Sequence, residues 1–275
     1  MNIGGGGGRG GNNTQTLVNG AITPTLTTSQ TQLRFRLLNA SNEGFYTIGF
    51  NDNREFYQVA TDGGLLPTAV SLTRLEIGPA ERVEIVVDVT SASDFILQSY
   101  PSRDANNGNR NGTTTLLTIQ PTASAAAVAL PVTLNTIERL PVSSAAVTRD
   151  IVLAGGDNNP TINGQSMTTA TMDMSTLLQV RLGDSEIWNL INRSRDTHLF
   201  HVHDVQFQIL DRSSGALAAN ELVLKDTIMV PPGESARIIM RFTDFTDAMI
   251  PYMYHCHILE HENNGMMGEF LVIPA

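Results

Sequence analysis

The sequence predicts an all-β protein built from two tandem β-sandwich domains. Short apolar runs are bounded by turn residues, no stretch shows sustained helical periodicity, and one pattern occurs in both halves of the chain. These features are typical of sandwiches and barrels. With 275 residues, the chain is long enough for two domains that each bury a core.

The expected strands are clearest in the first half of the chain. Residues 33–38 alternate apolar and basic side chains, which favours a strand with one buried face. Residues 56–60 run into the glycine-containing turn 62–64, and residues 82–88 and 116–119 form further apolar runs. We expect each of these runs to be a strand.

The second half repeats the first. Asn39 precedes Glu81 by 42 positions, and Asn192 precedes Glu234 by the same interval, in similar local sequences. Several parallels in the same order, with a period of 153 residues, indicate two domains related by duplication.

Composition shifts predict the domain boundaries. We expect a glycine-rich, flexible N-terminus over residues 1–16 and a first domain over 17–122. Residues 123–148 are rich in Ala, Ser, Thr and Pro, which is typical of an interdomain connection, and 149–275 form the second domain.

The charge balance excludes several classes of partner. The net charge is -10, Lys225 is the only lysine, and no basic run exists, so neither nucleic acid nor an anionic membrane is expected to bind. No apolar run approaches the roughly 20 residues of a membrane span, and the first residues lack the pattern of a signal peptide. The single cysteine excludes an internal disulfide.

All six histidines and the only cysteine lie in two short stretches, residues 197–203 and 254–267. Histidines scattered at random would not group in this way, so we interpret the two stretches as one metal centre. Only the second copy of the repeat carries them. Where the period places His198, the first copy has Phe45.

Alternation along strands sorts these residues into two sets. Cys256 and His198 share one face. The opposite face carries His201, His203, His255 and His257. A turn after Cys256 is expected to bring His261 back beside the thiol, and Gly265 permits a tight bend before Met266.

Cysteine, two histidines and a more distant methionine form the ligand set of a blue-copper site, whereas zinc seldom takes a thioether. The four remaining imidazoles suit copper ions that bind an oxygen species. The peptide bonds that join Cys256 to His255 and His257 would carry electrons between the two sets. The alternative is that the histidines are structural and that Met266 and Met267 fill a core.

These motifs resemble those of the multicopper oxidase family, especially laccase-like bacterial copper-efflux and spore-coat enzymes. Residues 198–203 are similar to the family motif His-Pro-x-His-x-His, and residues 255–266 match His-Cys-His-x3-His-x4-Met. Residues 19–22, 60–67 and 225–227 resemble further family segments. The resemblance runs from about residue 17 to the end. It implies the second and third domains of a three-domain enzyme, each a cupredoxin-like Greek-key β-sandwich.

The resemblance implies a role for each candidate residue. The type 1 copper, which accepts electrons from the substrate, would be bound by His198, Cys256, His261 and Met266. His201 would bind the type 2 copper. The type 3 pair would be bound by His203, His255 and His257. The expected catalytic residues are Cys256 and Glu262. Cys256 is a ligand of the copper that accepts electrons, and Glu262 matches an acidic position implicated in proton delivery. The alternative for Glu262 is an exposed charge in a turn.

Three departures from the family pattern stand out. Leu199 replaces the usual proline, and Asp204 replaces a common glycine. The third concerns the trinuclear cluster, which in the family takes eight histidines, four of them from an N-terminal domain. We therefore expect an N-terminal cupredoxin domain as partner, either on a separate chain or lost by truncation.

The implied reaction is one-electron oxidation of phenolic or aromatic substrates, or of metal ions, coupled to reduction of dioxygen to water. The resemblance also implies a periplasmic or extracellular location. No methionine-rich insert is present, which favours a laccase-like role over a dedicated cuprous oxidase.

Three alternatives remain open. The chain could be a blue-copper electron-transfer or copper-binding module with only the type 1 site. Two copies could assemble and bring eight cluster histidines together at a two-fold interface. A two-domain copper nitrite reductase is the third alternative. For that class, His255 and His257 on both sides of Cys256 are a poorer fit than for a three-copper cluster.

Overall fold

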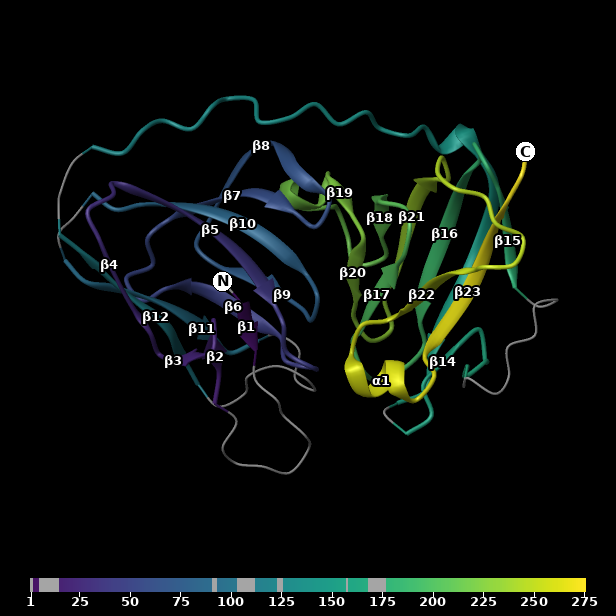
Figure 1. The fold of residues 1–275 in the computed structure, drawn as a ribbon, viewed down its shortest axis with the longest axis horizontal. Coiled ribbons are helices and arrows are strands. Elements are labelled where there is room, and N and C mark those ends of the chain that lie inside the picture. The colour runs from purple at the N-terminus through teal and green to yellow at the C-terminus, as the bar shows by residue number, and fades with distance from the viewer. Residues whose placement is uncertain are drawn as a thin grey trace. The chain divides into compact units, whose positions relative to one another are not determined.

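The computed structural model describes residues 2–4, 15–90, 93–102, 112–122, 126–156, 158–167 and 177–275. These residues are mostly strands, and they form two compact units, Met1–Thr136 and Ile137–Ala275 (Figure 1). The all-β prediction is therefore confirmed. In this part of the chain, no helix is long and apolar enough to cross a membrane.

The first unit contains a seven-stranded and a five-stranded sheet. The larger has the order β3-β2-β1-β5-β10-β7-β8 and consists of β1 (Asn2–Gly4), β2 (Leu17–Val18), β3 (Ala21–Ile22), β5 (Gln32–Asn39), β7 (Phe56–Thr61), β8 (Gly64–Leu72) and β10 (Arg82–Asp88). The smaller has the order β4-β12-β11-β6-β9 and consists of β4 (Thr25–Thr28), β6 (Tyr46–Phe50), β9 (Leu75–Ile77), β11 (Phe95–Tyr100) and β12 (Thr114–Pro121).

Buried apolar residues from both sheets fill the core of the first unit. The ring of Phe50 meets Phe56 and Phe95 edge to face, with centroids 5.9 and 5.5 Å apart. Each such side chain stabilises the fold by about 1.5–3 kcal/mol through removal from water.

The second unit contains a six-stranded and a five-stranded sheet. The larger has the order β14-β13-β16-β21-β18-β19 and consists of β13 (Ala145–Ala154), β14 (Thr161–Ile162), β16 (Ser185–Asn192), β18 (Phe207–Arg212), β19 (Leu224–Lys225) and β21 (Ser235–Arg241). The smaller has the order β15-β23-β22-β17-β20 and consists of β15 (Leu178–Arg181), β17 (His198–Val202), β20 (Thr227–Val230), β22 (Tyr252–Cys256) and β23 (Met267–Ile273). Short helices are η1 (Val142–Ser144), η3 (Ala219–Glu221) and α1 (Leu259–Asn263).

Trp188 lies at the centre of the second core and is fully buried. Its ring packs against Tyr254 at 5.3 Å and Phe270 at 5.9 Å between centroids.

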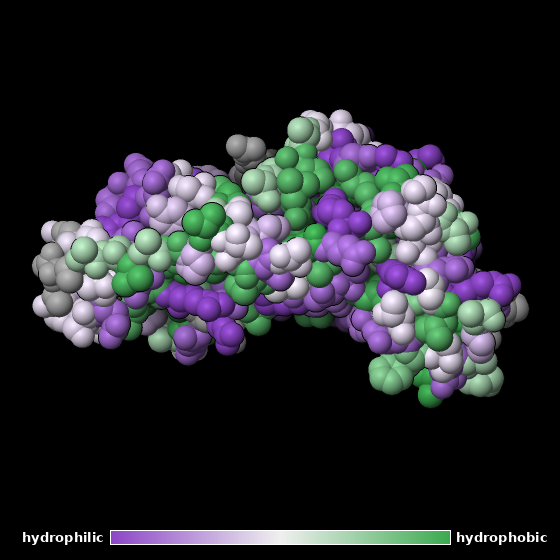
Figure 2. Space-filling view, turned by 90° about the horizontal axis from the view of Figure 1, so that it is seen from above, coloured by the Kyte–Doolittle hydropathy of each residue, from purple (hydrophilic) through white to green (hydrophobic). Residues whose placement is uncertain are grey.

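At the surface, hydrophobic residues lie among hydrophilic ones on the face shown in Figure 2, which is ordinary for a folded protein.

The two units share one topology, as the internal repeat predicts. In the first, β1 and β4 pair in parallel with β5 and β12, and in the second, β13 and β15 pair in parallel with β16 and β23. Asn39 donates its N–H to the Glu81 carbonyl at 3.2 Å, and Asn192 donates to that of Glu234 at 2.9 Å. Equivalent hydrogen bonds at the expected interval support the duplication.

The pairing register corrects one detail of the repeat. His198 lies opposite Val230 in the β17–β20 pair, and Tyr46 lies opposite Ile77 in the β6–β9 pair. The residue at the place of His198 is therefore Tyr46 and not Phe45. The preceding loop differs in length by one residue between the copies, so a fixed period fails here.

Two elements fall inside stretches for which no strand was expected. β1 lies within residues 1–16 and pairs with β5, while residues 5–14, which include most of the glycine tract, lie outside the described residues. β13 begins at Ala145, within the expected connection 123–148. Its alternating Val147-Thr148-Arg149-Asp150-Ile151 run pairs in parallel with β16.

Candidate metal centre

Two adjacent strands, β17 and β22, position most of the candidate ligands. They pair antiparallel, with His201 opposite His255 and Phe200 opposite Cys256. Directly opposed residues project from the same face of a sheet. The register therefore places His201 and His255 together on one face and the thiol on the other, as strand alternation predicts.

The face of the thiol carries a compact set of two imidazoles and one sulfur. Cys256 Sγ lies 3.7 Å from His198 Nδ1 and 3.5 Å from His261 Nδ1, and these two nitrogens are 3.2 Å apart. All three side chains are fully buried. His261 reaches the thiol because α1 turns the chain back directly after β22. Two Nδ1 atoms and a sulfur converging on one point fit a copper ion of type 1.

Met266 is tied to this set through the backbone. Its carbonyl accepts the Cys256 N–H at 3.0 Å, and its own N–H donates to the His261 carbonyl at 2.9 Å. The side chain is fully buried. Gly265 makes the bend possible, since its φ is +87° and a Cβ there would lie 2.4 Å from the Met167 carbonyl oxygen.

Because Cys256 is fully buried, its thiolate would need a neighbouring cation. Burial raises the pKa of the thiol to about 12, while backbone N–H groups of Ile258 and Leu199 donate hydrogen bonds to the sulfur and oppose that rise. A cation at the sulfur would neutralise the thiolate and offset its desolvation. Leu199 replaces the proline of the family motif, and a proline would have no N–H to donate.

Four imidazoles gather on the other face. His203 Nε2 lies 3.2 Å from His255 Nε2, and His201 joins them in a group whose ligand atoms lie within 4.8 Å of one another. The ring centroid of His257 lies 5.2 Å from that of His255 and 5.7 Å from that of His201. The structure thus brings together all four histidines that alternation assigned to this face.

Burial keeps three of these four imidazoles in the uncharged form that binds metal ions. Burial lowers the pKa of His255 to about 3 and also lowers the pKa of His201 and His203. Near neutral pH the three rings are therefore uncharged, and each has a free lone pair to offer a metal ion.

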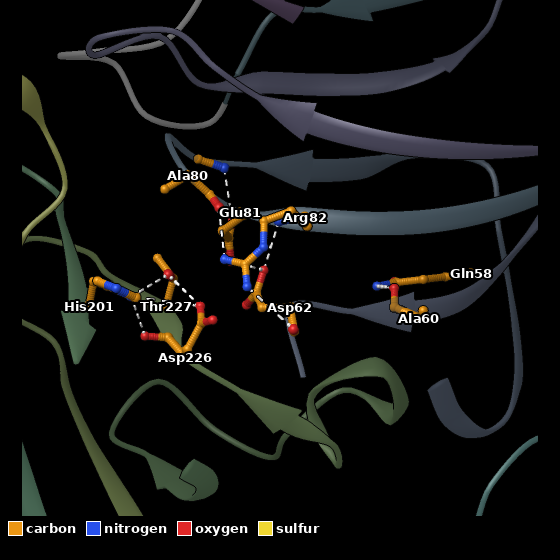
Figure 3. A network of polar contacts seen from close by, with 10 residues as sticks. Gln58, Ala60, Asp62, Ala80, Glu81, Arg82, His201, Asp226 and Thr227 are labelled. Atoms are coloured by element: carbon orange, nitrogen blue, oxygen red, sulfur yellow. Dashed lines mark hydrogen bonds and ion pairs between the residues drawn. The ribbon is translucent and has the colours of Figure 1, made fainter. Parts of the chain in front are cut away.

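The Nδ1 atom of His201 is held by the first residue of β20, Thr227, and by Asp226 just before it (Figure 3). His201 Nδ1 donates to the Asp226 carbonyl at 2.9 Å and approaches Thr227 Oγ1 at 3.1 Å. The Thr227 hydroxyl in turn donates to Asp226 Oδ1. A proton on Nδ1 leaves the lone pair of Nε2 available to a metal ion.

Glu262 faces the imidazole group. It lies on α1, and its Oε2 is 3.5 Å from His255 Nδ1, with 29% of the side chain exposed. This partly buried position differs from that of a free charge in a turn. Asp204 has a φ of 74°, a left-handed conformation that explains the glycine common at this place in the family.

Sequence reasoning missed two groups around the ligands. Ser194 Oγ lies 2.8 Å from His198 Nε2, and Asp226 with Thr227 holds His201. The first could have been found, because Asn-x-Ser recurs at 39–41 and 192–194 in the repeat. The second lies in the family-like segment 225–227, but its contact with His201 runs through a backbone carbonyl, which the residue types do not reveal.

Comparison with known proteins agrees with this site. A family model described as multicopper oxidase matches residues 143–275, and another with that description matches residues 3–122. The chain is 31% identical over 260 residues to a multicopper oxidase, mco, of Staphylococcus haemolyticus, which covers 93% of this chain and 52% of the relative. It is 31% identical over 279 residues to a laccase of Bacillus subtilis, covering 91% and 53%.

Among solved structures, the multicopper oxidase McoA of Aquifex aeolicus matches with a TM-score of 0.84 and 31% identity, over 94% of this chain and 59% of that one. Each unit thus has a cupredoxin-like β-sandwich fold. The chain belongs to the multicopper oxidases, a family of copper-using oxidoreductases. It spans about half the length of the curated relatives it matches.

Proposed function

We propose that this chain supplies the type 1 copper site and half of the trinuclear cluster of a laccase-like oxidase. The type 1 ligands are His198, Cys256, His261 and Met266. The cluster ligands are His201 for type 2 copper and His203, His255 and His257 for the type 3 pair. Copper, when bound, would accept single electrons from a reducing substrate and pass them to dioxygen.

One observation carries this proposal: the two ligand sets meet at a single dipeptide. Cys256 belongs to the buried set, and its sulfur lies within 3.7 Å of the Nδ1 atoms of His198 and His261. The preceding residue, His255, belongs to the imidazole group. A covalent path through a single peptide bond would therefore link the site that takes electrons to the site that uses them.

Glu262 would hold and release protons. Reduction of dioxygen to water consumes protons inside a confined site, and a carboxylate 3.5 Å from the His255 ring can deliver them there. The partial exposure of Glu262 allows it to be reprotonated from solvent.

The remaining cluster ligands must come from polypeptide outside this chain. All six histidines of the sequence are already used, two in the type 1 set and four in the cluster. A further cupredoxin domain of the kind found in three-domain relatives is the partner we propose. The proposed substrates are phenols, aromatic amines or reducing metal ions, and the proposed location is periplasmic or extracellular.

The proposal is tested by copper titration of the chain, with the visible spectrum and oxygen uptake recorded on the same sample. We expect about one tightly bound copper per chain with an intense thiolate-to-copper band. Addition of an N-terminal cupredoxin domain from a three-domain relative should then raise the copper content toward about four and start oxygen uptake. Loss of the band in Cys256→Ser is the matched control.

Two results would contradict the proposal. Absence of the thiolate band in the copper-loaded chain would exclude the type 1 site. A blue site that exchanges electrons with mediators but never supports oxygen uptake, even with the added domain, would favour an electron-transfer module. That alternative is favoured by one observation, namely that all four expected type 1 ligands belong to the second unit.

A further inference from the structure

Ser194 lies on the far side of the His198 ring from the thiol. Its Oγ is 2.8 Å from His198 Nε2, while His198 Nδ1 faces Cys256 Sγ at 3.7 Å. The imidazole is therefore held between a hydroxyl and the copper-binding sulfur. Which of its two nitrogens carries the proton decides whether the ring can bind a metal on the side of the thiol.

The hydrogen bonds around Ser194 determine the direction of that contact. Its hydroxyl lies 2.8 Å from Asn192 Oδ1 and 2.9 Å from the Asp196 carbonyl, and both oxygens only accept. The single hydroxyl proton is donated to them. The Asp196 N–H donates back to Oγ at 3.2 Å, which leaves one lone pair of the hydroxyl for His198.

We propose that Ser194 is a positioning residue that selects the tautomer of His198. Since Oγ has no second proton to donate, Nε2 is the nitrogen that carries hydrogen. The Nδ1 lone pair is then directed at Cys256 and His261. This inference rests on the proposed function only in naming copper as the ion that uses this lone pair.

The first unit contains the same turn without the histidine. Ser41 donates to Asn39 Oδ1 at 2.6 Å and to the Gly44 carbonyl at 2.8 Å. Tyr46 occupies the register position of His198. The Asn-x-Ser turn thus has a structural role in both units, and in the second it also orients a ligand.

Asn192 makes the arrangement rigid. Its Nδ2 donates to the Asp196 carbonyl and to the Val230 carbonyl, both at 2.8 Å. Val230 is the residue that lies opposite His198 in the sheet. Through Asn192, Ser194 is therefore fixed to the β17–β20 strand pair that also carries His198.

The test compares Ser194→Ala with Ser41→Ala in the full chain. Both changes remove the hydroxyl of the same turn, but only the first removes the partner of a ligand. We expect the copper affinity to fall by about tenfold or more in Ser194→Ala, as for other groups that orient metal ligands. It should stay unchanged in Ser41→Ala and return with Ser194→Thr.

A second measurement separates this inference from the proposed function. In the copper-free chain labelled with ¹⁵N-histidine, His198 should show the Nε2–H tautomer, with its signals assigned by their loss in His198→Gln. In Ser194→Ala these signals should shift toward the other tautomer. If the tautomer of His198 shifts in Ser194→Ala but the unsubstituted chain fails to bind copper on titration, the proposed function is overturned and the role of Ser194 is supported. An unchanged tautomer would overturn the role of Ser194, whatever the copper affinity.

Discussion

The two units are built on one framework and differ at the positions proposed to bind metal. By register, Tyr46 stands at the place of His198 and Ser99 at that of Cys256. Ser99 is fully buried, as is Cys256, so the first unit keeps the polar position but replaces sulfur by oxygen.

The same holds for the imidazole face. Gly49 and Gln98 oppose each other where His201 and His255 oppose each other in the second unit. The framework itself is unaffected, because the Asn-x-Ser turn and the sheet order recur in both units. A cupredoxin-like sandwich therefore does not depend on metal for its topology, and a few side chains on two neighbouring strands decide whether it holds copper.

The largest expected effect is the complete loss of the blue band in Cys256→Ser, because a hydroxyl replaces the thiolate that we propose as the copper ligand and as the source of the intense absorption. Visible spectroscopy during copper titration measures it.

The converse change sharpens the comparison. Ser99→Cys adds a thiol in the first unit but no imidazole at Tyr46, so no new band is expected. A second blue band would contradict the view that the imidazoles are required.

Removal of the turn asparagine should affect the two units equally. Asn39→Ala and Asn192→Ala each delete hydrogen bonds to two backbone carbonyls, one buried and one partly buried. We expect each to lower the free energy of unfolding of its own unit by about 2–3 kcal/mol. Urea unfolding, followed by the fluorescence of Trp188 for the second unit and by circular dichroism for both, measures it. If only one of the two substitutions lowered the stability of its unit, the result would argue against a shared framework.

Gly265→Ala should be more harmful than the same change at Gly20. Both glycines have positive φ, +87° and +82°, but a Cβ at Gly20 meets no atom within 4 Å, whereas one at Gly265 lies 2.4 Å from the Met167 carbonyl oxygen. Gly20→Ala should cost about 1 kcal/mol of stability. Gly265→Ala should cost more, and it should shift the blue band because Met266 is displaced. Equal losses in urea unfolding, with an unchanged band, would contradict this.

The smallest expected effect concerns Thr227→Val. It removes the hydroxyl 3.1 Å from His201 Nδ1, while the Asp226 carbonyl at 2.9 Å remains as the acceptor. The His201 tautomer should persist, with a stability loss of about 1 kcal/mol and no change in the blue band. Histidine ¹⁵N shifts of the copper-free chain measure this, with Thr227→Ser as control. A change of tautomer would show that the hydroxyl, and not the carbonyl, holds the ring.

Much of the candidate site could be predicted from the sequence because strand alternation is a local property. The assignment of Cys256 to one face and His255 to the other needs only adjacent residues in an extended chain. The two-residue spacing of His201 and His203 likewise placed them together. By contrast, the place of Tyr46 was missed, because register depends on the length of a loop and on the strand across from it.

By itself, the sequence determined the all-β class, the duplication and the membership of each ligand set, since these follow from residue types and their spacing. Only the tertiary structure decided which ring nitrogen faces the proposed metal site. That choice depends on Ser194 behind His198 and on the Asp226 carbonyl behind His201. A ring nitrogen is selected by the hydrogen bond on its far side, and the groups that make it are brought there by turns and strand pairing that no local pattern specifies.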